Sequence, residues 1–131
     1  MKQIFIVLAF VLTCSTMFAK QPQRPNSYNY QRGVEALVEG EVATGIDYLN
    51  KELEENPKNG YAHGWIAAAR ASQSEYGAAL TAVNKAMQYI PKKDAEYTSW
   101  AYSMRANIYL ELEDTVAALK DFNQAIKINP S

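Results

Sequence analysis

Three prolines, each following an apolar segment with helical spacing, set the period of this chain. They are Pro57, Pro91 and Pro130, and the first two lie 34 residues apart. A period of this length is typical of one helix-turn-helix unit of a solenoid. Such units bury their apolar faces against one another, and the stack presents an extended surface to other proteins. The spacing therefore predicts an all-α chain whose function is binding.

The first residues have the composition of a targeting signal. Lys2 supplies a positive charge, residues 4–12 form an uninterrupted apolar run, and residues 13–19 are mostly small and polar. The run is shorter than the roughly 20 apolar residues of a membrane span. We expect a signal peptide over 1–19 that is cleaved after Ala19. The protein would then be exported, periplasmic or secreted, with no membrane insertion after cleavage.

Cys14 leaves a second processing route open. A cysteine directly after the apolar run resembles the acylated cysteine of bacterial lipoproteins, although Thr13 is not the Gly, Ala or Ser that normally precedes it. Lipidation at Cys14 would give a membrane-anchored lipoprotein, and an uncleaved anchor is the third alternative. Cys14 is the only cysteine, so a chain cut after Ala19 can form no disulfide and depends on its packed core.

The charge balance argues against some classes of partner. The chain has 13 basic and 14 acidic residues, and removal of Lys2 with the signal leaves a formal net charge of −2. This balance gives no electrostatic reason to expect nucleic acid or anionic lipid as a partner. Residues 20–27 carry two prolines and almost no apolar side chain, so we expect an extended leader there.

Placing each proline at position 32 of a 34-residue unit predicts repeats over 26–59, 60–93 and 99–131. Small residues recur where the two helices of a unit must cross closely: Gly33, Ala67 and Ala106 at position 8, and Gly45, Ala79 and Ala118 at position 20. Apolar residues recur at positions 21, 24 and 28, on one face of the second helix. Acidic residues stand near the start of that helix: Glu41, Glu75 and Asp114.

This pattern resembles the tetratricopeptide repeat family. The third unit matches it best, through Tyr102, Ala106, Tyr109, Ala118, Phe122, Ala125 and Pro130. The second unit keeps Ile66, Ala67, Ala79, Ala86 and Pro91, and the first keeps only Gly33, Leu49 and Pro57. The resemblance covers 26–130 and implies a right-handed α-solenoid of about three repeats. We expect no capping helix after the last repeat.

Five extra residues separate the second and third units, because Pro91 and Pro130 lie 39 residues apart. They fit at 94–98. Asp94 is a good N-cap and no helix breaker follows it before Ser99, so we expect the next helix to begin more than one turn early. A simple loop insertion is the alternative.

The family resemblance implies a concave groove lined by the first helix of each unit. The residues at the groove positions are Tyr30, Val34, Leu37, Tyr61, Ala68, Ala71, Trp100, Ser103, Asn107 and Leu110. Chaperone-binding members of the family grip a C-terminal carboxylate with Lys, Arg and Asn, and apart from Asn107 that basic clamp is missing here. A hydrophobic peptide or an amphipathic helix suits this groove better. Alternatively, the leader around Tyr28 and Tyr30 covers part of it.

The last helix suggests a second surface. Some of its apolar residues should be exposed at the end of the array, which would favour a homodimer or a partner at that end: Leu119, Phe122, Ile126 and Ile128.

No catalytic or metal-binding motif occurs in the sequence. The single histidine, His63, has no second histidine and no cysteine of the mature chain to complete a zinc site, and it stands at a packing position. No phosphate loop, nucleophile elbow or HExxH occurs. We therefore expect no metal, no cofactor and no enzyme, but a protein-protein interaction scaffold of the bacterial cell envelope or exterior. The alternative is an N-terminal helper module or fragment of a larger exported enzyme.

Overall fold

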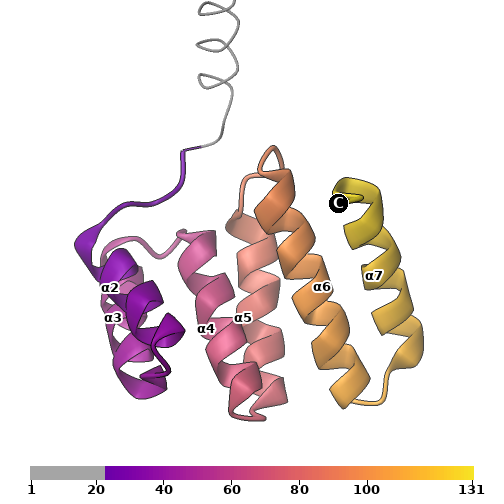
Figure 1. The fold of residues 1–131 in the computed structure, drawn as a ribbon, viewed down its shortest axis with the longest axis horizontal. Helices are drawn as coiled ribbons and strands as arrows, with labels where there is room; N and C mark the ends of the chain where they lie inside the picture. Colours follow the sequence, from indigo (N-terminus) through magenta and orange to yellow (C-terminus); the bar gives the residue numbers. More distant parts are fainter. Residues whose placement is uncertain (1–22) are drawn as a thin grey trace, which may run out of the picture.

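A computed structural model describes residues 23–131, which form six helices and no strand (Figure 1). The expected signal peptide over 1–19 and Cys14 lie outside the described residues. The helices are α2 (Tyr28–Val38), α3 (Val42–Glu55), α4 (Gly60–Ser72), α5 (Tyr76–Tyr89), α6 (Ala95–Glu111) and α7 (Thr115–Ile128). Short turns connect them, so consecutive helices run antiparallel in three pairs (Figure 1).

The three pairs stack into a curved array. The first helices of successive pairs contact each other, α2 against α4 and α4 against α6, whereas α3 does not reach α5 and α5 does not reach α7. Helices on the inside of a bend lie closer than those on the outside. The inner, concave layer is therefore α2, α4 and α6, as expected for the groove.

Small residues sit at the helix crossings, as the repeat register predicted. A Cβ on Gly33 would lie 2.7 Å from Cγ of Leu49, and one on Gly45 would lie 2.5 Å from Cδ2 of Leu37. In the later pairs the alanines at these positions are no more than 1% exposed: Ala67, Ala79, Ala106 and Ala118. Because there is no room for a larger side chain, these positions fix how closely the two helices of a pair approach.

The acidic residues expected near the starts of the second helices are N-caps, but they act differently. Glu41 and Glu75 precede α3 and α5 without a side-chain capping bond, whereas Asp114 accepts a 3.1 Å hydrogen bond from the N–H of Ala117. α6 begins at Ala95, with Asp94 accepting from the N–H of Tyr97 at 3.2 Å. The early start predicted for this helix is thus present.

One apolar core runs through the first five helices. Its largest fully buried apolar side chains are Leu49, Val83 and Ile108. Between α6 and α7 the packing includes an ion pair, because the buried Asp121 accepts from Nε and Nη2 of Arg105 at 2.7 and 2.9 Å. None of the six helices is both long and apolar enough to cross a membrane.

Candidate functional site

Three aromatic rings meet on the inner face between α4 and α6. The rings of Trp65 and Tyr97 each lie 5.3 Å from that of Trp100, measured between ring centroids. With Glu96 these rings line a cavity of about 270 Å³. Of the three, the sequence had singled out only Trp100. Tyr97 is not among the predicted groove residues because it lies in the five-residue insertion, and Trp65 because it does not stand at a groove position of its unit.

Two predicted groove residues belong to the core instead, which corrects the sequence analysis. Tyr30 is 8% exposed and Tyr61 is 4% exposed. The hydroxyl of Tyr30 accepts from Nε1 of Trp65 at 3.1 Å, and that of Tyr61 donates to Asp94 at 2.9 Å. Burial raises the pKa of both tyrosines well above its ordinary value. Neither ring can contact a partner unless the packing opens.

The remaining predicted groove residues differ in accessibility. Half-buried residues are Val34, Leu37, Ala68, Ala71, Trp100 and Ser103, and exposed ones are Asn107 and Leu110. Val34, Leu37 and Ala71 also pack against the core. The accessible part of the inner face thus lies along the second half of α6. That these residues bind a partner stays a prediction.

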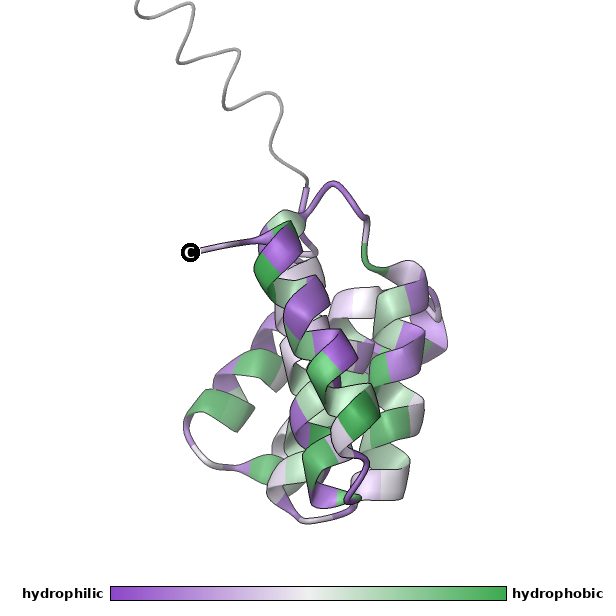
Figure 2. Cartoon of the chain, turned by 90° about the vertical axis from the view of Figure 1, so that its right-hand side faces the viewer, coloured by the Kyte–Doolittle hydropathy of each residue, from purple (hydrophilic) through white to green (hydrophobic). Residues whose placement is uncertain are grey.

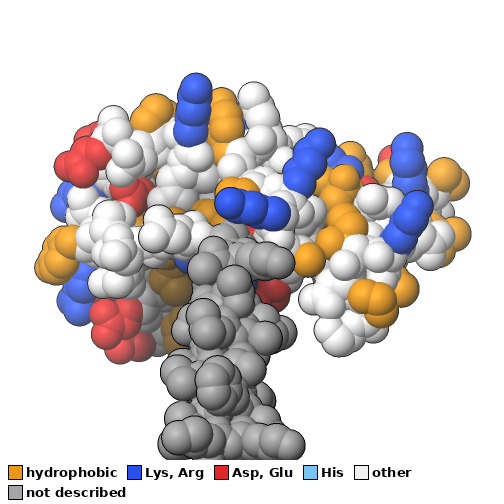
Figure 3. Space-filling view, turned by 90° about the horizontal axis from the view of Figure 1, so that it is seen from above, with side chains coloured by type: hydrophobic (Ala, Val, Ile, Leu, Met, Phe, Trp, Pro, Cys, Tyr) orange, Lys and Arg blue, Asp and Glu red, His pale blue; other side chains and the backbone are white. Residues whose placement is uncertain are grey.

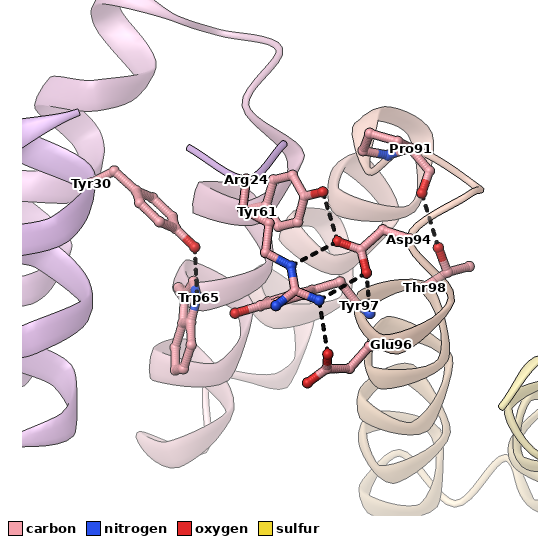
Figure 4. A network of polar contacts seen from close by, with 9 residues as sticks. All are labelled: Arg24, Tyr30, Tyr61, Trp65, Pro91, Asp94, Glu96, Tyr97 and Thr98. Carbon is pink, nitrogen blue, oxygen red and sulfur yellow. Dashed lines mark hydrogen bonds and ion pairs between the residues drawn. The ribbon is translucent and has the colours of Figure 1, made fainter. Parts of the chain in front are cut away.

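Next to the aromatic rings, a guanidinium from the leader lies on an acidic site (Figure 4). Nε and Nη2 of Arg24 donate to the two carboxylate oxygens of Asp94 at 3.1 and 3.2 Å, and Nη2 also donates to Glu96 at 2.8 Å. The guanidinium carbon stands 4.6 Å from the centroid of the Tyr97 ring. The leader therefore does cover part of the inner face, through Arg24. Tyr28 remains 68% exposed.

Asp94 is ionised in this arrangement. Its burial acts to raise the pKa of the carboxyl, but hydrogen bonds from Arg24, Tyr61 and the N–H of Tyr97 outweigh burial and hold the pKa below its usual value. Tyr61 and the N–H of Tyr97 also donate to this carboxylate, so its position does not depend on Arg24 alone.

The inner helices carry three arginines, and each is paired within the chain. Arg32 pairs with Glu35 and Arg70 with Glu75, both at 3.1 Å, and Arg105 pairs with Asp121 at 2.7 Å. Figure 3, which shows the array from above, shows basic side chains spread over the visible surface among hydrophobic and uncharged ones. The inner helices therefore hold no basic clamp that could grip a carboxylate.

A second, larger cavity lies between the leader, the turn from α3 to α4 and the end of α5. It measures about 670 Å³ and is lined in part by Ser27, Glu52 and Asn56. Glu52 is 1% exposed and accepts from the Ser27 hydroxyl and, at 2.7 Å, from Nδ2 of Asn56. Only its departure from the alanines at the same repeat position, Ala86 and Ala125, marks it in the sequence.

His63 has the packing role that the sequence predicted. Its ring stacks on Tyr89 at 6.0 Å between centroids, and Nε2 lies 3.0 Å from the carbonyl oxygen of Pro57. Burial lowers the pKa of the imidazole. Within residues 23–131, no group of His, Cys, Asp and Glu is arranged to hold a metal ion.

α7 forms one end of the array, and its ribbon in Figure 2, seen from that end, alternates between hydrophobic and hydrophilic residues. Leu119 and Ile126 are each 62% exposed, and Val116, which the sequence had not singled out, is 82% exposed. Phe122 and Ile128, the other two predicted residues, are half-buried. The expected exposure at this end is therefore present for part of the set.

Three antiparallel helix pairs, stacked with their first helices inside, define an all-α helical-repeat solenoid. Residues 99–131 match the family model of the tetratricopeptide repeat. A solved structure with the same fold is the first TPR of Spaghetti (RPAP3) bound to the HSP90 peptide SRMEEVD, which is 20% identical, with a TM-score of 0.71 over 79% of this chain and 78% of that one. Residues 99–131 are thus a tetratricopeptide repeat by sequence, and the six helices of residues 23–131 fit about three such repeats. No curated protein matches it in sequence.

The fold class and the family resemblance predicted from the sequence are thereby confirmed. Helical-repeat arrays present extended concave surfaces, and a typical function of this fold is to bind other proteins without catalysis. The fold and the family therefore support a protein or peptide as partner.

Proposed function

We propose that this chain is a non-catalytic scaffold that binds a peptide or a short helix of a partner protein on its inner face. The observation that carries the proposal is the aromatic cavity of Trp65, Tyr97 and Trp100, continued along α6 by the exposed Asn107 and Leu110. Aromatic rings beside exposed apolar and amide groups are typical of peptide grooves. The peptide bound to the solved neighbour adds support from the same fold.

The charges on the inner helices bear on which peptide would bind. The neighbour's ligand, SRMEEVD, is rich in acidic residues. Here every arginine of α2, α4 and α6 is already paired with a carboxylate of the chain, while Glu96 remains 72% exposed. Releasing an arginine for an acidic ligand would break such a pair. The groove therefore suits an apolar or basic segment better than an acidic one.

A pair of leucines provides a matched test. Leu110 and Leu112 are both 45% exposed, but Leu110 belongs to α6 and stands at a groove position, whereas Leu112 is the C-cap of α6. Residues two apart in a helix point about 200° apart. We expect Leu110→Glu to lose the partner that the wild-type chain captures, because a carboxylate would be buried at the contact. Leu112→Glu should capture it as the wild type does.

The comparison is made by affinity capture from an envelope fraction, with mass spectrometry of the bound proteins. Both variants must first give the circular dichroism spectrum and melting temperature of the wild type. Equal capture by both variants, or loss in both, would count against the inner face as the binding surface. Trp100 is less suitable for this test, since a Cβ on Gly64 would already lie 2.6 Å from its ring, and a charged residue there would disturb the fold.

We also propose that the chain is exported, to the periplasm or beyond the cell, after removal of residues 1–19. The support is the order of a positive residue, an apolar run and small residues at the N-terminus. Intact-mass measurement on protein purified from its native host distinguishes the routes. A chain that begins at Lys20 supports cleavage after Ala19, a chain that begins at a lipidated Cys14 supports an anchored lipoprotein, and an unprocessed chain contradicts both.

The face of α7 favours a second candidate function, self-association of two copies. Val116, Leu119 and Ile126 follow one another at helical spacing and are all more than half exposed. Sedimentation velocity at micromolar concentration tests this candidate. A dimer that becomes a monomer in Leu119→Lys would support it, and a wild-type monomer would rule it out at that concentration.

A further inference from the structure

Arg24 and the acidic site that it contacts differ in how firmly each is held by the rest of the fold. The acidic side is built into the folded array, because Asp94 is 2% exposed, caps α6 and accepts from Tyr61. The ring of Tyr97 is held by Tyr61 and Trp100, at centroid distances of 5.0 and 5.3 Å. None of these contacts requires Arg24. The site is therefore preorganised for a cation, and its geometry would persist when the guanidinium leaves.

The occupant is held far less firmly than the site. Arg24 has a side chain that is 42% exposed, and it lies on an extended segment rather than on a helix. Within the described part of the chain, the one other side-chain hydrogen bond of residues 23–27 is from Ser27 to Glu52. Four contacts hold the guanidinium at the acidic site, two with Asp94, one with Glu96 and one with the ring of Tyr97. All four belong to one side chain, so rotation of that side chain would empty the site.

The chemistry of the site selects a guanidinium. Asp94 receives two parallel N–H groups, Glu96 receives one, and Tyr97 offers its ring face (Figure 4). A planar fork satisfies both oxygens of one carboxylate while it stacks on an aromatic ring, which the compact ammonium of lysine cannot do. Stacking of a cation on a tyrosine face adds further attraction.

The neighbouring cavity indicates what would flank the guanidinium. Glu96 and Tyr97, which contact Arg24, also line the 270 Å³ cavity together with Trp65 and Trp100. An arginine at the acidic site and an apolar side chain in this cavity would lie side by side on the inner face. The two subsites together fit a peptide in which an arginine neighbours an apolar residue.

We propose that Asp94, Glu96 and Tyr97 form an arginine-binding site for a partner peptide, and that Arg24 is its internal occupant, which the partner's arginine must displace. This proposal deepens the proposed function and rests on it, since the peptide lies on the same inner face. The occupant is a basic peptide segment, consistent with the absence of a free basic clamp on the inner helices.

The test uses the chain's own leader sequence as the probe. The acetylated and amidated peptide PQRPNS, which is the sequence of residues 22–27, is titrated into the full chain carrying Arg24→Ala. The chain has two tryptophans, Trp65 and Trp100, and both line the cavity beside the site, so their fluorescence reports binding directly. Peptides with lysine or alanine in place of arginine are the matched controls.

We expect the arginine peptide to bind Arg24→Ala saturably, the lysine peptide to bind more weakly and the alanine peptide not to bind. The wild-type chain should bind the arginine peptide more weakly, by about tenfold if its own Arg24 leaves the site free for about a tenth of the time. Adding Glu96→Gln should weaken binding about threefold, as expected for a partner that is mostly exposed. This residue does not cap α6, so the variant should fold normally.

Three results would overturn the proposal: no saturable binding to Arg24→Ala, equal affinity in wild type and variant, or equal affinity for the arginine and alanine peptides. Should Arg24→Ala fail to fold, Arg24→Lys takes its place, since it keeps a cation beside Asp94 but loses the fork, and an intermediate affinity is expected. If the peptide does not bind but the wild-type chain still captures its partner through Leu110, the arginine site is rejected and the proposed function stands. If the peptide binds but Leu110→Glu and Leu112→Glu capture the partner equally, the inner face is rejected as the partner-binding surface and the arginine site stands.

Discussion

Gly60 at the start of α4 offers the sharpest test of the packing between helices. It is buried, and a Cβ added there would lie 2.7 Å from the carbonyl carbon of Tyr89 and closer still to the backbone nitrogen of Ile90. Both atoms are backbone at the end of α5, where the N–H of Ile90 donates to the carbonyl of Ala86 at 2.8 Å. The change Gly60→Ala must therefore move one helix end away from the other.

The magnitude follows from the overlap. Ordinary contact with a Cβ begins at 3.4 Å, so the carbonyl carbon of Tyr89 would be about 0.7 Å too close. Overpacking of this kind costs about 1 to 3 kcal/mol. Loss of glycine entropy from the unfolded chain returns about 0.5 to 1 kcal/mol. We expect a net loss of about 1.5 kcal/mol in the free energy of unfolding, and a melting temperature lower by roughly 6 to 12 °C.

Gly77 is the matched control. It lies in the first turn of α5, where an added Cβ meets no atom within 4 Å. The change Gly77→Ala should stabilise the fold by about 0.5 kcal/mol through the same entropy effect, and raise the melting temperature by roughly 2 to 4 °C. The two glycine variants thus differ in sign although the chemical change is identical.

Thermal unfolding followed by far-ultraviolet circular dichroism, with urea unfolding for the free energies, measures both variants against the wild type. A Gly60→Ala chain that melts with the wild type or above it would refute the close approach of α4 to the end of α5. Equal shifts of both variants would mean that chain entropy, rather than packing, decides the effect at both sites.

Three further predictions concern single side chains. Arg105→Met should lower the free energy of unfolding in urea by about 3 kcal/mol, since it leaves the buried Asp121 without its cation. Adding Asp121→Leu to this variant should recover much of the loss. A double variant that is no more stable than Arg105→Met would contradict the pairing. Because burial lowers the pKa of His63 below its ordinary value of 6.5, the unfolded chain takes up the proton more readily. The free energy of unfolding should therefore fall as the pH drops through that value, an effect absent in His63→Gln. Asp114→Ala should lower the free energy of unfolding, measured by thermal unfolding, by about 1 kcal/mol, because the side-chain cap of α7 is lost. Glu41→Ala should change it by less than about 0.5 kcal/mol, because Glu41 makes no side-chain hydrogen bond to α3. Equal losses would show that charge, and not the hydrogen bond, stabilises the helix start.

Most of the helical layout follows from features that repeat along the chain. The crossings at Gly33 and Gly45 and the early start of α6 after Asp94 were expected from spacing and from local capping chemistry. The candidate site was only partly foreseen. Asn107 and Leu110 are accessible as expected, but Tyr30 and Tyr61 are buried, since a family position says which way a residue points and not what covers it.

The residues that the sequence missed are those whose role depends on distant partners. Trp65 donates to Tyr30, which is 35 residues earlier, and Glu52 accepts from Ser27, which is 25 residues earlier. Their separations of 35 and 25 residues differ from the 34-residue period, so the repeat pattern gives no reason to expect these pairs.

The sequence by itself determined that this protein is a stack of helix pairs, because period, small crossing residues and caps act within one or two turns of chain. Only the tertiary structure decided what the inner face offers to a partner. The contact of Arg24 with Asp94 spans 70 residues, and it exists because three helix pairs bring the leader back over the start of α6. Contacts of that range depend on the curvature of the whole array, which no local pattern encodes.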